Sequence, residues 1–546
     1  MSEPTVDAVD ATEDIQTDYE VGQDNIQKWG LDIHNPVFLV SGGVIVVFVA
    51  LSLLFQAQAE SFFTWLRPFL TSNLDWLFLI VGNIFVIFAV FLIFSPLGKV
   101  RLGGPDAKPE FNYAGWFAML FAAGMGIGLM FYGVSEPLTH YSASVAADAA
   151  TSGDAPLMGA ANDPEAARSL AMAATIFHWG LHPWAIYAVV GLALALFSFN
   201  KGLPLTVRSA FYPIFGEAVW GWLGHVIDTL AVFATLFGLA TSLGFGAEQA
   251  LAGLNHIFGI PDTDPWKVGL IVAITGCALT SVVAGLDAGV RRISEINMVL
   301  AFLLLVFVII VGPTLAILTG FFTNMLAYAE KIVPLSNFIG REDDGFRTGW
   351  TTFYWAWWIS WSPFVGMFIA RVSYGRTVRE FMISVLIVPT VVSVLWMTAF
   401  GGTAISQLQS GFQGAVEADL PLKLFVVLEQ LPLASIASFI GIVLVIVFFV
   451  TSSDSGSLVI DTITAGGKMD APVAQRVFWA SFEGLVAIAL LLGGGLTALQ
   501  SAAVATGFPF AIILVLMVYC TYQGLRGEKK ALDEAEAAAQ EASATA

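Results

Sequence analysis

Long apolar runs separated by short polar stretches dominate the pattern of this chain. An α-helix needs about 20 residues to cross the apolar core of a bilayer. Twelve runs have approximately that length, at residues 37–56, 75–97, 114–134, 170–198, 226–254, 267–285, 294–319, 350–370, 382–402, 436–460, 475–493 and 505–524. The pattern therefore predicts an all-α polytopic membrane protein with twelve transmembrane helices, embedded in a lipid bilayer over residues 37–525.

The composition agrees with this interpretation and excludes other classes. Hydrophobic residues make up 57% of the 546 residues and charged residues 12%, whereas a soluble domain carries roughly 25% charged residues. A membrane β-barrel would show short alternating segments in place of long unbroken runs. About half of the net charge of −19 lies at the two ends: residues 1–36 are expected to form an acidic disordered tail and residues 526–546 a short acidic tail. No basic region points to nucleic acid.

The distribution of Lys and Arg predicts the orientation in the membrane. An even number of spans puts both termini on one side, and placing them inside leaves 16 of the 23 basic residues in inner loops. Inner loops are the ones enriched in Lys and Arg, so both termini are expected in the cytoplasm. Among the outer loops, residues 321–342 are compatible with an amphipathic helix in the membrane interface and equally with an ordinary loop.

Two spans carry the residues that break a membrane helix. Residues 124–128 read Gly-Met-Gly-Ile-Gly, and residues 360–363 read Ser-Trp-Ser-Pro. Transporters bind substrates near the midplane on helices broken in this way, although Gly-x-Gly also serves close helix packing. The two spans are five apart and cross in opposite directions, as an inverted repeat would require.

Aromatic residues cluster in residues 177–187 and 353–361. Some of them could belong to an interfacial aromatic belt. Four tryptophans in seven residues beside a proline in the middle of a span favour a different interpretation. Aromatic faces form cages for quaternary ammonium or sulfonium cations, and such a cage needs no buried carboxylate.

A third signal is a polar stretch at residues 451–457, in which five hydroxyl residues accompany Asp454. Hydroxyl oxygens and carbonyls released at a broken helix are suitable ligands for Na⁺ as a coupling ion. His178 and His182 have i,i+4 spacing, but no third zinc ligand is evident nearby. No hydrolase or ATPase motif is present, so an enzyme is not expected.

With these motifs the chain resembles the betaine/choline/carnitine transporter family, close to its Na⁺-coupled glycine betaine branch. The resemblance covers all spans and is most specific at residues 124–132, 177–187, 353–371 and 451–457. It implies two N-terminal helices followed by two inverted five-helix repeats of the leucine-transporter type, at about 114–320 and 350–525. It also implies a homotrimer in the bacterial inner membrane.

The resemblance also assigns site residues. The onium cage falls on Trp179, Trp184, Tyr187 and Trp358, Trp361 lies on the cytoplasmic side of the substrate path, and Gly124, Met125, Gly126 and Gly128 complete the substrate site. One Na⁺ site falls on the carbonyls of Ala122, Met125 and Phe448 and on the hydroxyls of Thr451 and Ser452. A second Na⁺ site would use Thr235 and Phe364, but Leu239 stands where betaine carriers have another Thr, so the Na⁺ stoichiometry stays open.

The function expected from this resemblance is Na⁺-driven import of a zwitterionic onium solute, with glycine betaine first. Choline carriers tend to have an acidic residue at the position of Gly128. The absence of an acid here favours a substrate that carries its own negative charge. Dimethylsulfoniopropionate, ectoine, choline and carnitine remain alternatives, as does a Na⁺-independent exchanger. A channel would need a filter segment, and none is visible.

Overall fold

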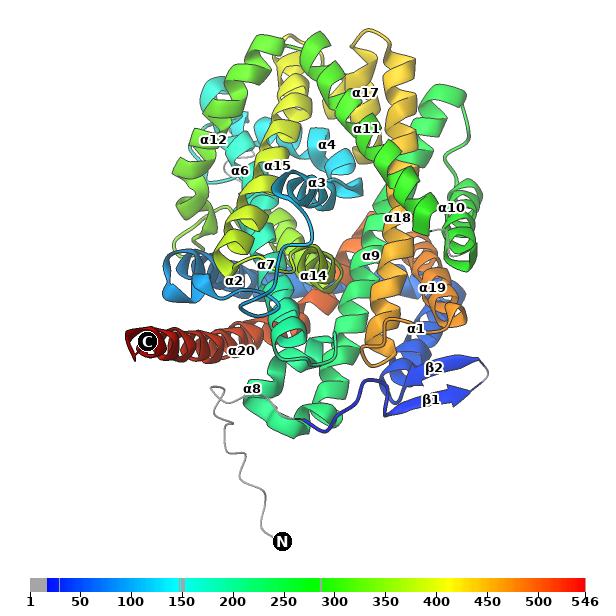
Figure 1. Cartoon of the computed structure of the whole chain (residues 1–546). Coiled ribbons are helices and arrows are strands. Elements are labelled where there is room, and N and C mark those ends of the chain that lie inside the picture. Colours follow the sequence, from blue (N-terminus) through cyan, green and yellow to red (C-terminus); the bar gives the residue numbers. More distant parts are fainter. Residues whose placement is uncertain (1–16, 29, 147, 149–152, 285–286, 546) are drawn as a thin grey trace.

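The computed structural model describes residues 17–545 except residues 29, 147, 149–152 and 285–286, and it is almost entirely helical (Figure 1). Its long helices are α1 (Val37–Leu54), α2 (Gln56–Phe94), α3 (Tyr113–Gly124), α4 (Ile127–Val145), α6 (Pro164–Trp179), α7 (Leu181–Ala195), α9 (Trp222–Phe258), α10 (Asp264–Ala284), α11 (Asp287–Val311), α12 (Thr314–Ser336), α14 (Thr352–Val372), α15 (Val378–Gln409), α18 (Ala434–Thr464), α19 (Val473–Leu492) and α20 (Gly495–Thr545). The shorter elements are β1 (Asn25–Lys28), β2 (Leu31–His34), α8 (Tyr212–Phe215), α13 (Asp344–Phe346), α16 (Gly414–Glu417) and α17 (Lys423–Glu429).

Ten helices of the described residues are long and apolar enough to cross a membrane, or eleven if the bent pair α3 and α4 counts as one span. The protein is therefore a multi-pass membrane protein. The expected span at 350–370 falls on α14, which is not among these helices because its tryptophans and serines make it less apolar. The count of twelve and the division into two repeats stay predictions. Residues 321–336 of the predicted outer segment belong to the helix α12.

Two of the spans are interrupted, but the break expected at residues 360–363 is absent, because α14 continues from Thr352 to Val372 with Pro363 inside it. Helices α3 and α4 meet at an angle of 62° across Met125 and Gly126. Helix α6 ends and α7 begins at Gly180, where an added Cβ would lie 2.7 Å from the Ile176 carbonyl oxygen and 3.0 Å from the Tyr328 hydroxyl. Glycine thus allows the chain to break here beside a neighbouring helix. All residues of α7 except Leu181 are buried, and so are 16 of the 21 residues of α14.

The N-terminal segment differs from the expected disordered tail. Residues 1–16 lie outside the described residues, but β1 and β2 form an antiparallel hairpin. The Asn25 side chain donates to the Ala465 carbonyl at 2.9 Å, and the Asp32 N–H donates to the Gln475 side chain at 2.7 Å. Lys468 also bonds to the Asp32 carboxylate. The prediction of disorder is thus wrong for the hairpin. Polar groups at the ends of α18 and α19 bond to it and hold it in place.

His34 of the hairpin is fully buried, and neither of its ring nitrogens has a hydrogen-bond partner. Burial lowers the pKa of His34 to about 3, and the nearby charges of Arg208 and His225 act in the same direction. His34 is therefore held neutral while the hairpin is docked.

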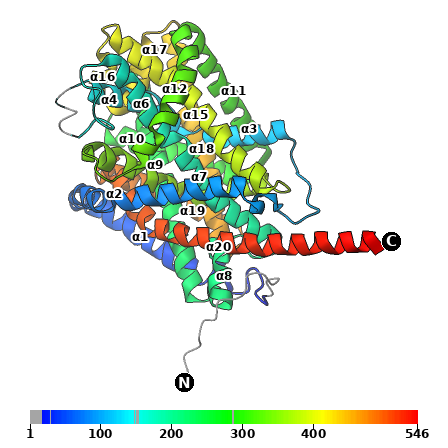
Figure 2. The same cartoon turned by 90° about the vertical axis from the view of Figure 1, so that its left-hand side faces the viewer.

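The C-terminal segment is helical and not an extended tail. Helix α20 continues through residues 526–545 and projects beyond the bundle (Figure 2). Its sequence there is rich in Ala, Glu and Lys, which have high helix propensity. Lys529 and Asp533 form an i,i+4 ion pair on its surface. Local propensity therefore favours this extension, and an ion pair between Glu528 and Lys201 at 2.7 Å ties its first turn to the bundle.

Candidate functional site

The break between α3 and α4 opens onto a partly open cavity with a volume of about 40 Å³. All nine residues predicted to bind substrate line this one cavity: Gly124, Met125, Gly126, Gly128, Trp179, Trp184, Tyr187, Trp358 and Trp361. They come from α3, α4, α6, α7, α14 and the break itself. The tertiary fold thus brings together residues that are up to 237 positions apart, between Gly124 and Trp361.

The four aromatic residues of the predicted cage lie around this cavity in edge-to-face pairs. The rings of Trp179 and Trp358 are 4.9 Å apart at 71°, and those of Trp184 and Tyr187 are 5.3 Å apart at 77°. Tyr187 also lies 6.3 Å from Trp358. All four side chains are buried. Desolvated aromatic rings in this arrangement can attract an organic cation.

Sequence reasoning missed several residues of the wall, namely Ala123, Leu129, Pro183, Ser242, Trp357 and Ser393. Trp357 stacks on Trp358 with ring centroids 4.5 Å apart and donates its indole N–H to the Ser242 hydroxyl at 3.2 Å. Trp357 belongs to the aromatic run that was recognised. Ser242 and Ser393, by contrast, are single serines in long apolar helices, and no local pattern distinguishes them.

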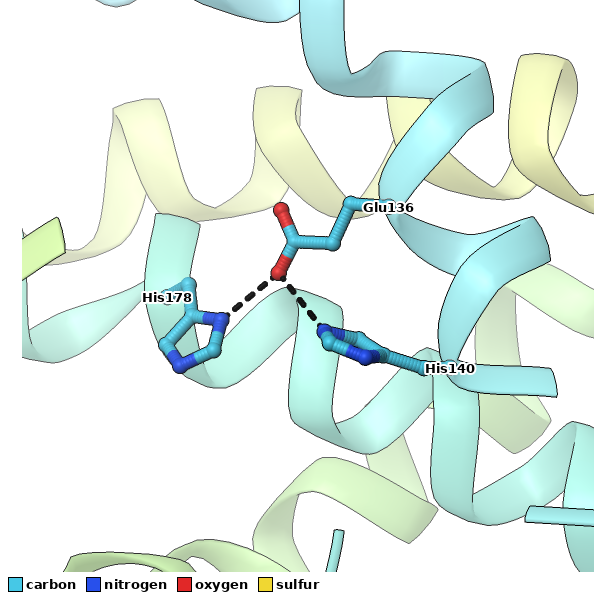
Figure 3. Close-up of side chains that lie close together, drawn as sticks. All are labelled: Glu136, His140 and His178. Atoms are coloured by element: carbon cyan, nitrogen blue, oxygen red, sulfur yellow. Dashed lines mark hydrogen bonds and ion pairs between the residues drawn. The ribbon is translucent and has the colours of Figure 1, made fainter. Parts of the chain in front are cut away.

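Glu136 of α4 is the most important residue that was missed. It is fully buried, and its Oε2 accepts hydrogen bonds from the Trp179 indole at 2.7 Å and the Tyr354 hydroxyl at 2.5 Å. Its Oε1 lies 2.6 Å from His178 Nδ1 and 3.2 Å from His140 Nε2 (Figure 3). A single acid within a membrane helix is a signal for function that could have identified it.

Two inferences about this region concern the residues around Glu136. The statement that an aromatic cage needs no buried carboxylate stays a prediction, and the Glu136 carboxylate accepts the Trp179 indole N–H. His178 and His182 do not converge on one point, because His182 Nε2 bonds to the Asn83 side chain at 3.1 Å while His178 bonds to Glu136.

Glu136, His140 and His178 place three possible metal-binding atoms within 4.8 Å of one another. Two ligands of a tetrahedral zinc ion lie roughly 3.3 Å apart, because each is about 2.0–2.1 Å from the metal. The 2.6 Å between Glu136 Oε1 and His178 Nδ1 is instead a hydrogen-bond distance. In this arrangement Glu136 bonds to both histidines, and His140 Nδ1 is buried without a partner among the described residues.

The residues predicted for the first Na⁺ site come from the end of α3 and from α18. The Ala122 carbonyl accepts the Met125 N–H at 3.3 Å. Thr451 donates its hydroxyl hydrogen to the Val447 carbonyl at 3.0 Å, which leaves the lone pairs of its oxygen for a cation. Phe448 is buried, and Ser452 is half-buried on the same helix. Assembly of these groups around one ion stays a prediction.

The residues predicted for the second Na⁺ site make contacts with the protein itself. Thr235 donates its hydroxyl hydrogen to the Ala231 carbonyl at 2.7 Å, and the Phe364 ring packs 5.3 Å from Trp361. Leu239, which replaces the expected threonine, packs so closely on α18 that a Cβ at Gly456 would lie 2.3 Å from its Cδ1. Hydrocarbon packing thus occupies the position of the missing hydroxyl.

Comparison with known proteins adds independent information. Residues 36–530 match the family model described as BCCT, betaine/carnitine/choline family transporter. The chain is 62% identical, over 94% of its length and 95% of the relative's, to a glycine betaine/proline/choline transporter of Vibrio parahaemolyticus. It is 53% identical, over 94% of the chain and 91% of the relative, to a glycine betaine/proline/choline/ectoine transporter of the same organism.

A more distant relative is the glycine betaine transporter OpuD of Bacillus subtilis, which is 44% identical over 86% of this chain and 90% of its own length. These relatives are transporters and not enzymes, and the family model extends over nearly the whole helical region. Together with the membrane helices and the aromatic cavity, they show that this chain is a solute transporter of the betaine/carnitine/choline transporter family.

Proposed function

We propose that this protein imports a zwitterionic onium solute, glycine betaine first, and that a Na⁺ gradient drives the transport. The observation that carries the proposal is the cavity at the α3–α4 break, whose wall includes Trp179, Trp184, Tyr187 and Trp358. Aromatic rings bind a quaternary ammonium group without hydrogen bonds, which such a group cannot donate. The polar groups at the broken helix remain for the carboxylate end of the substrate.

The names of the relatives support this substrate class and widen it. Two relatives of Vibrio parahaemolyticus are named for glycine betaine, proline and choline, and one of them also for ectoine. Each of these solutes has a positively charged or charge-delocalised nitrogen centre that suits an aromatic cage. Choline, ectoine, proline, carnitine and dimethylsulfoniopropionate are therefore the competitors against which glycine betaine has to be tested.

Na⁺ coupling rests on the hydroxyls of Thr451 and Ser452 and on the carbonyls near the α3–α4 break. In this scheme twelve spans form two N-terminal helices and two inverted repeats, and one bundle rocks against the other around the cavity. Na⁺ would stabilise the conformation that binds substrate. The protein would act as a homotrimer in the bacterial inner membrane with both termini in the cytoplasm.

The test is uptake of radiolabelled glycine betaine into proteoliposomes containing the purified protein, with and without an inward Na⁺ gradient. Concentrative uptake that requires the gradient is expected, and unlabelled competitors rank the substrates. Uptake that is indifferent to Na⁺ but needs substrate inside the vesicles would identify an exchanger and refute the Na⁺ site. No uptake of any onium solute would refute the substrate class.

A further inference from the structure

A carboxyl group lies directly behind the aromatic cage. The Glu136 carboxylate is fully buried one layer behind the cavity wall, and the Trp179 indole N–H donates to it at 2.7 Å. Among the described residues, the ion-pair partners within 4.0 Å of this carboxylate are His140 and His178. No Lys or Arg therefore neutralises Glu136 directly in this part of the structure.

The hydrogen bonds around Glu136 are compatible with a full negative charge. Trp179 and Tyr354 are neutral donors to Oε2. A neutral His178 can donate from Nδ1 to Oε1 while its Nε2 accepts the Thr351 hydroxyl at 2.9 Å. A neutral His140 can likewise donate from Nε2. Four donors thus stabilise an ionised carboxylate, and none of them has to carry a positive charge.

The same cluster also positions the second tryptophan of the cage. The Trp358 indole N–H donates to the backbone carbonyl of His178 at 2.9 Å. The His178 ring itself stacks on Tyr354 with centroids 4.7 Å apart. Two of the three cage indoles are therefore held by one buried network that centres on Glu136 and His178, and movement of either residue would shift the wall of the cavity.

We propose that Glu136 is a positioning residue that also gives the cage a net negative potential, so that the site binds cationic onium solutes without a carboxylate of their own, such as choline. The inference rests on the proposed onium transport. A charge-assisted bond from the indole orients Trp179 and adds electron density to its ring. A buried charge is little screened by salt, so it attracts a cationic head group in the cavity. The absence of an acid at Gly128 therefore does not exclude choline.

The test uses Glu136→Gln, which preserves the shape of the side chain and removes the charge. Affinities for choline and glycine betaine are measured on the purified protein by the change in tryptophan fluorescence. Loss of the charge removes attraction for both head groups, but for glycine betaine it also removes repulsion of the substrate carboxylate. We expect affinity for choline to fall about tenfold or more and affinity for glycine betaine to fall clearly less.

Other variants separate charge from shape. His140→Lys introduces a cation beside Glu136 and should reduce choline binding selectively even if Glu136→Gln does not fold. Glu136→Asp retains the charge, so it should retain the ratio of the two affinities although its shorter side chain weakens both. Glu248→Gln is the matched control, because Glu248 pairs with Lys267 at 2.6 Å and does not line the cavity; its affinities should equal those of the wild type.

Each outcome is informative. If wild-type protein binds neither solute, the result refutes the proposed onium transport and does not bear on the role of Glu136. If the wild type binds and Glu136→Gln or His140→Lys weakens both solutes by the same factor, Glu136 has only a structural role and the inference is overturned. It is also overturned if the affinities do not change. A response to added Zn²⁺ that Glu136→Gln abolishes would instead assign a metal to the cluster and likewise refute it.

Discussion

Helix α4 approaches the cage closely at Gly128, and this contact yields a specific prediction. A Cβ added to Gly128 would lie 2.7 Å from Cη2 of Trp179 and 3.1 Å from Cη2 of Trp357. The first distance is 0.7 Å below the 3.4 Å at which ordinary van der Waals contact begins. Gly128→Ala therefore forces the Trp179 ring to move or α4 to shift at its first turn.

The Trp179 ring has little freedom to yield. Its indole N–H is held by Glu136 at 2.7 Å, and its ring packs edge-to-face 4.9 Å from Trp358. Overpacking a well-filled site costs roughly 1–3 kcal/mol. If this cost falls on the geometry that binds the onium group, affinity decreases about tenfold, since each factor of ten corresponds to about 1.4 kcal/mol.

The measurement is equilibrium binding of glycine betaine to purified Gly128→Ala protein. Gly82→Ala is the matched control, because a Cβ there would also clash with a tryptophan, at 2.8 Å from Nε1 of Trp355. Trp355 lies on α14 like Trp357 and Trp358, but it does not line the cavity. Gly82→Ala should lower the yield of folded protein without changing the affinity of the folded fraction. Wild-type affinity in Gly128→Ala, or an equal loss in Gly82→Ala, would refute the argument that the cage is locally crowded.

The remaining predictions concern the cage, the ion and the hairpin. Trp358→Ala removes one desolvated aromatic face and should weaken binding of glycine betaine by more than about tenfold in the same binding assay. Thr451→Ala combined with Ser452→Ala should abolish Na⁺-stimulated uptake into proteoliposomes. For His34, the folded-state pKa of about 3 lies below the ordinary 6.5, so the hairpin has full stability above pH 6.5 and loses it as the pH falls toward 3. Docking should be weaker by about 2 kcal/mol at pH 5, seen as faster hydrogen exchange of residues 25–34 after correction for intrinsic rates.

Each of these predictions has an outcome that contradicts it. Unchanged affinity in Trp358→Ala would remove that ring from the cage. Normal Na⁺ activation in the double variant would exclude Thr451 and Ser452 as ligands. Hydrogen exchange in the hairpin that is independent of pH between 7.5 and 5, or that responds to pH equally in His34→Gln, would show that His34 does not control docking.

Much of this protein could be predicted from local sequence. Apolar runs of membrane length predict transmembrane helices, because a backbone in lipid has to satisfy its hydrogen bonds within each segment. The glycines at residues 124–128 predicted the helix break that the structure contains, since glycine weakens a helix wherever it stands. The aromatic runs likewise indicated the chemistry of the cavity, because the residue types themselves determine it.

Other features depended on contacts between distant segments. In the sequence Glu136 is one acid in an apolar helix, and only the fold places Trp179 and Tyr354 against it. Ser242 is likewise identified as a wall residue only by its hydrogen bond from Trp357. The hairpin at 25–34 is short, so its order comes from docking partners more than 400 residues away. Local pattern thus determined which segments are helical and apolar. Tertiary structure decided which polar groups are buried together, because that depends on partners that no neighbouring residue reveals.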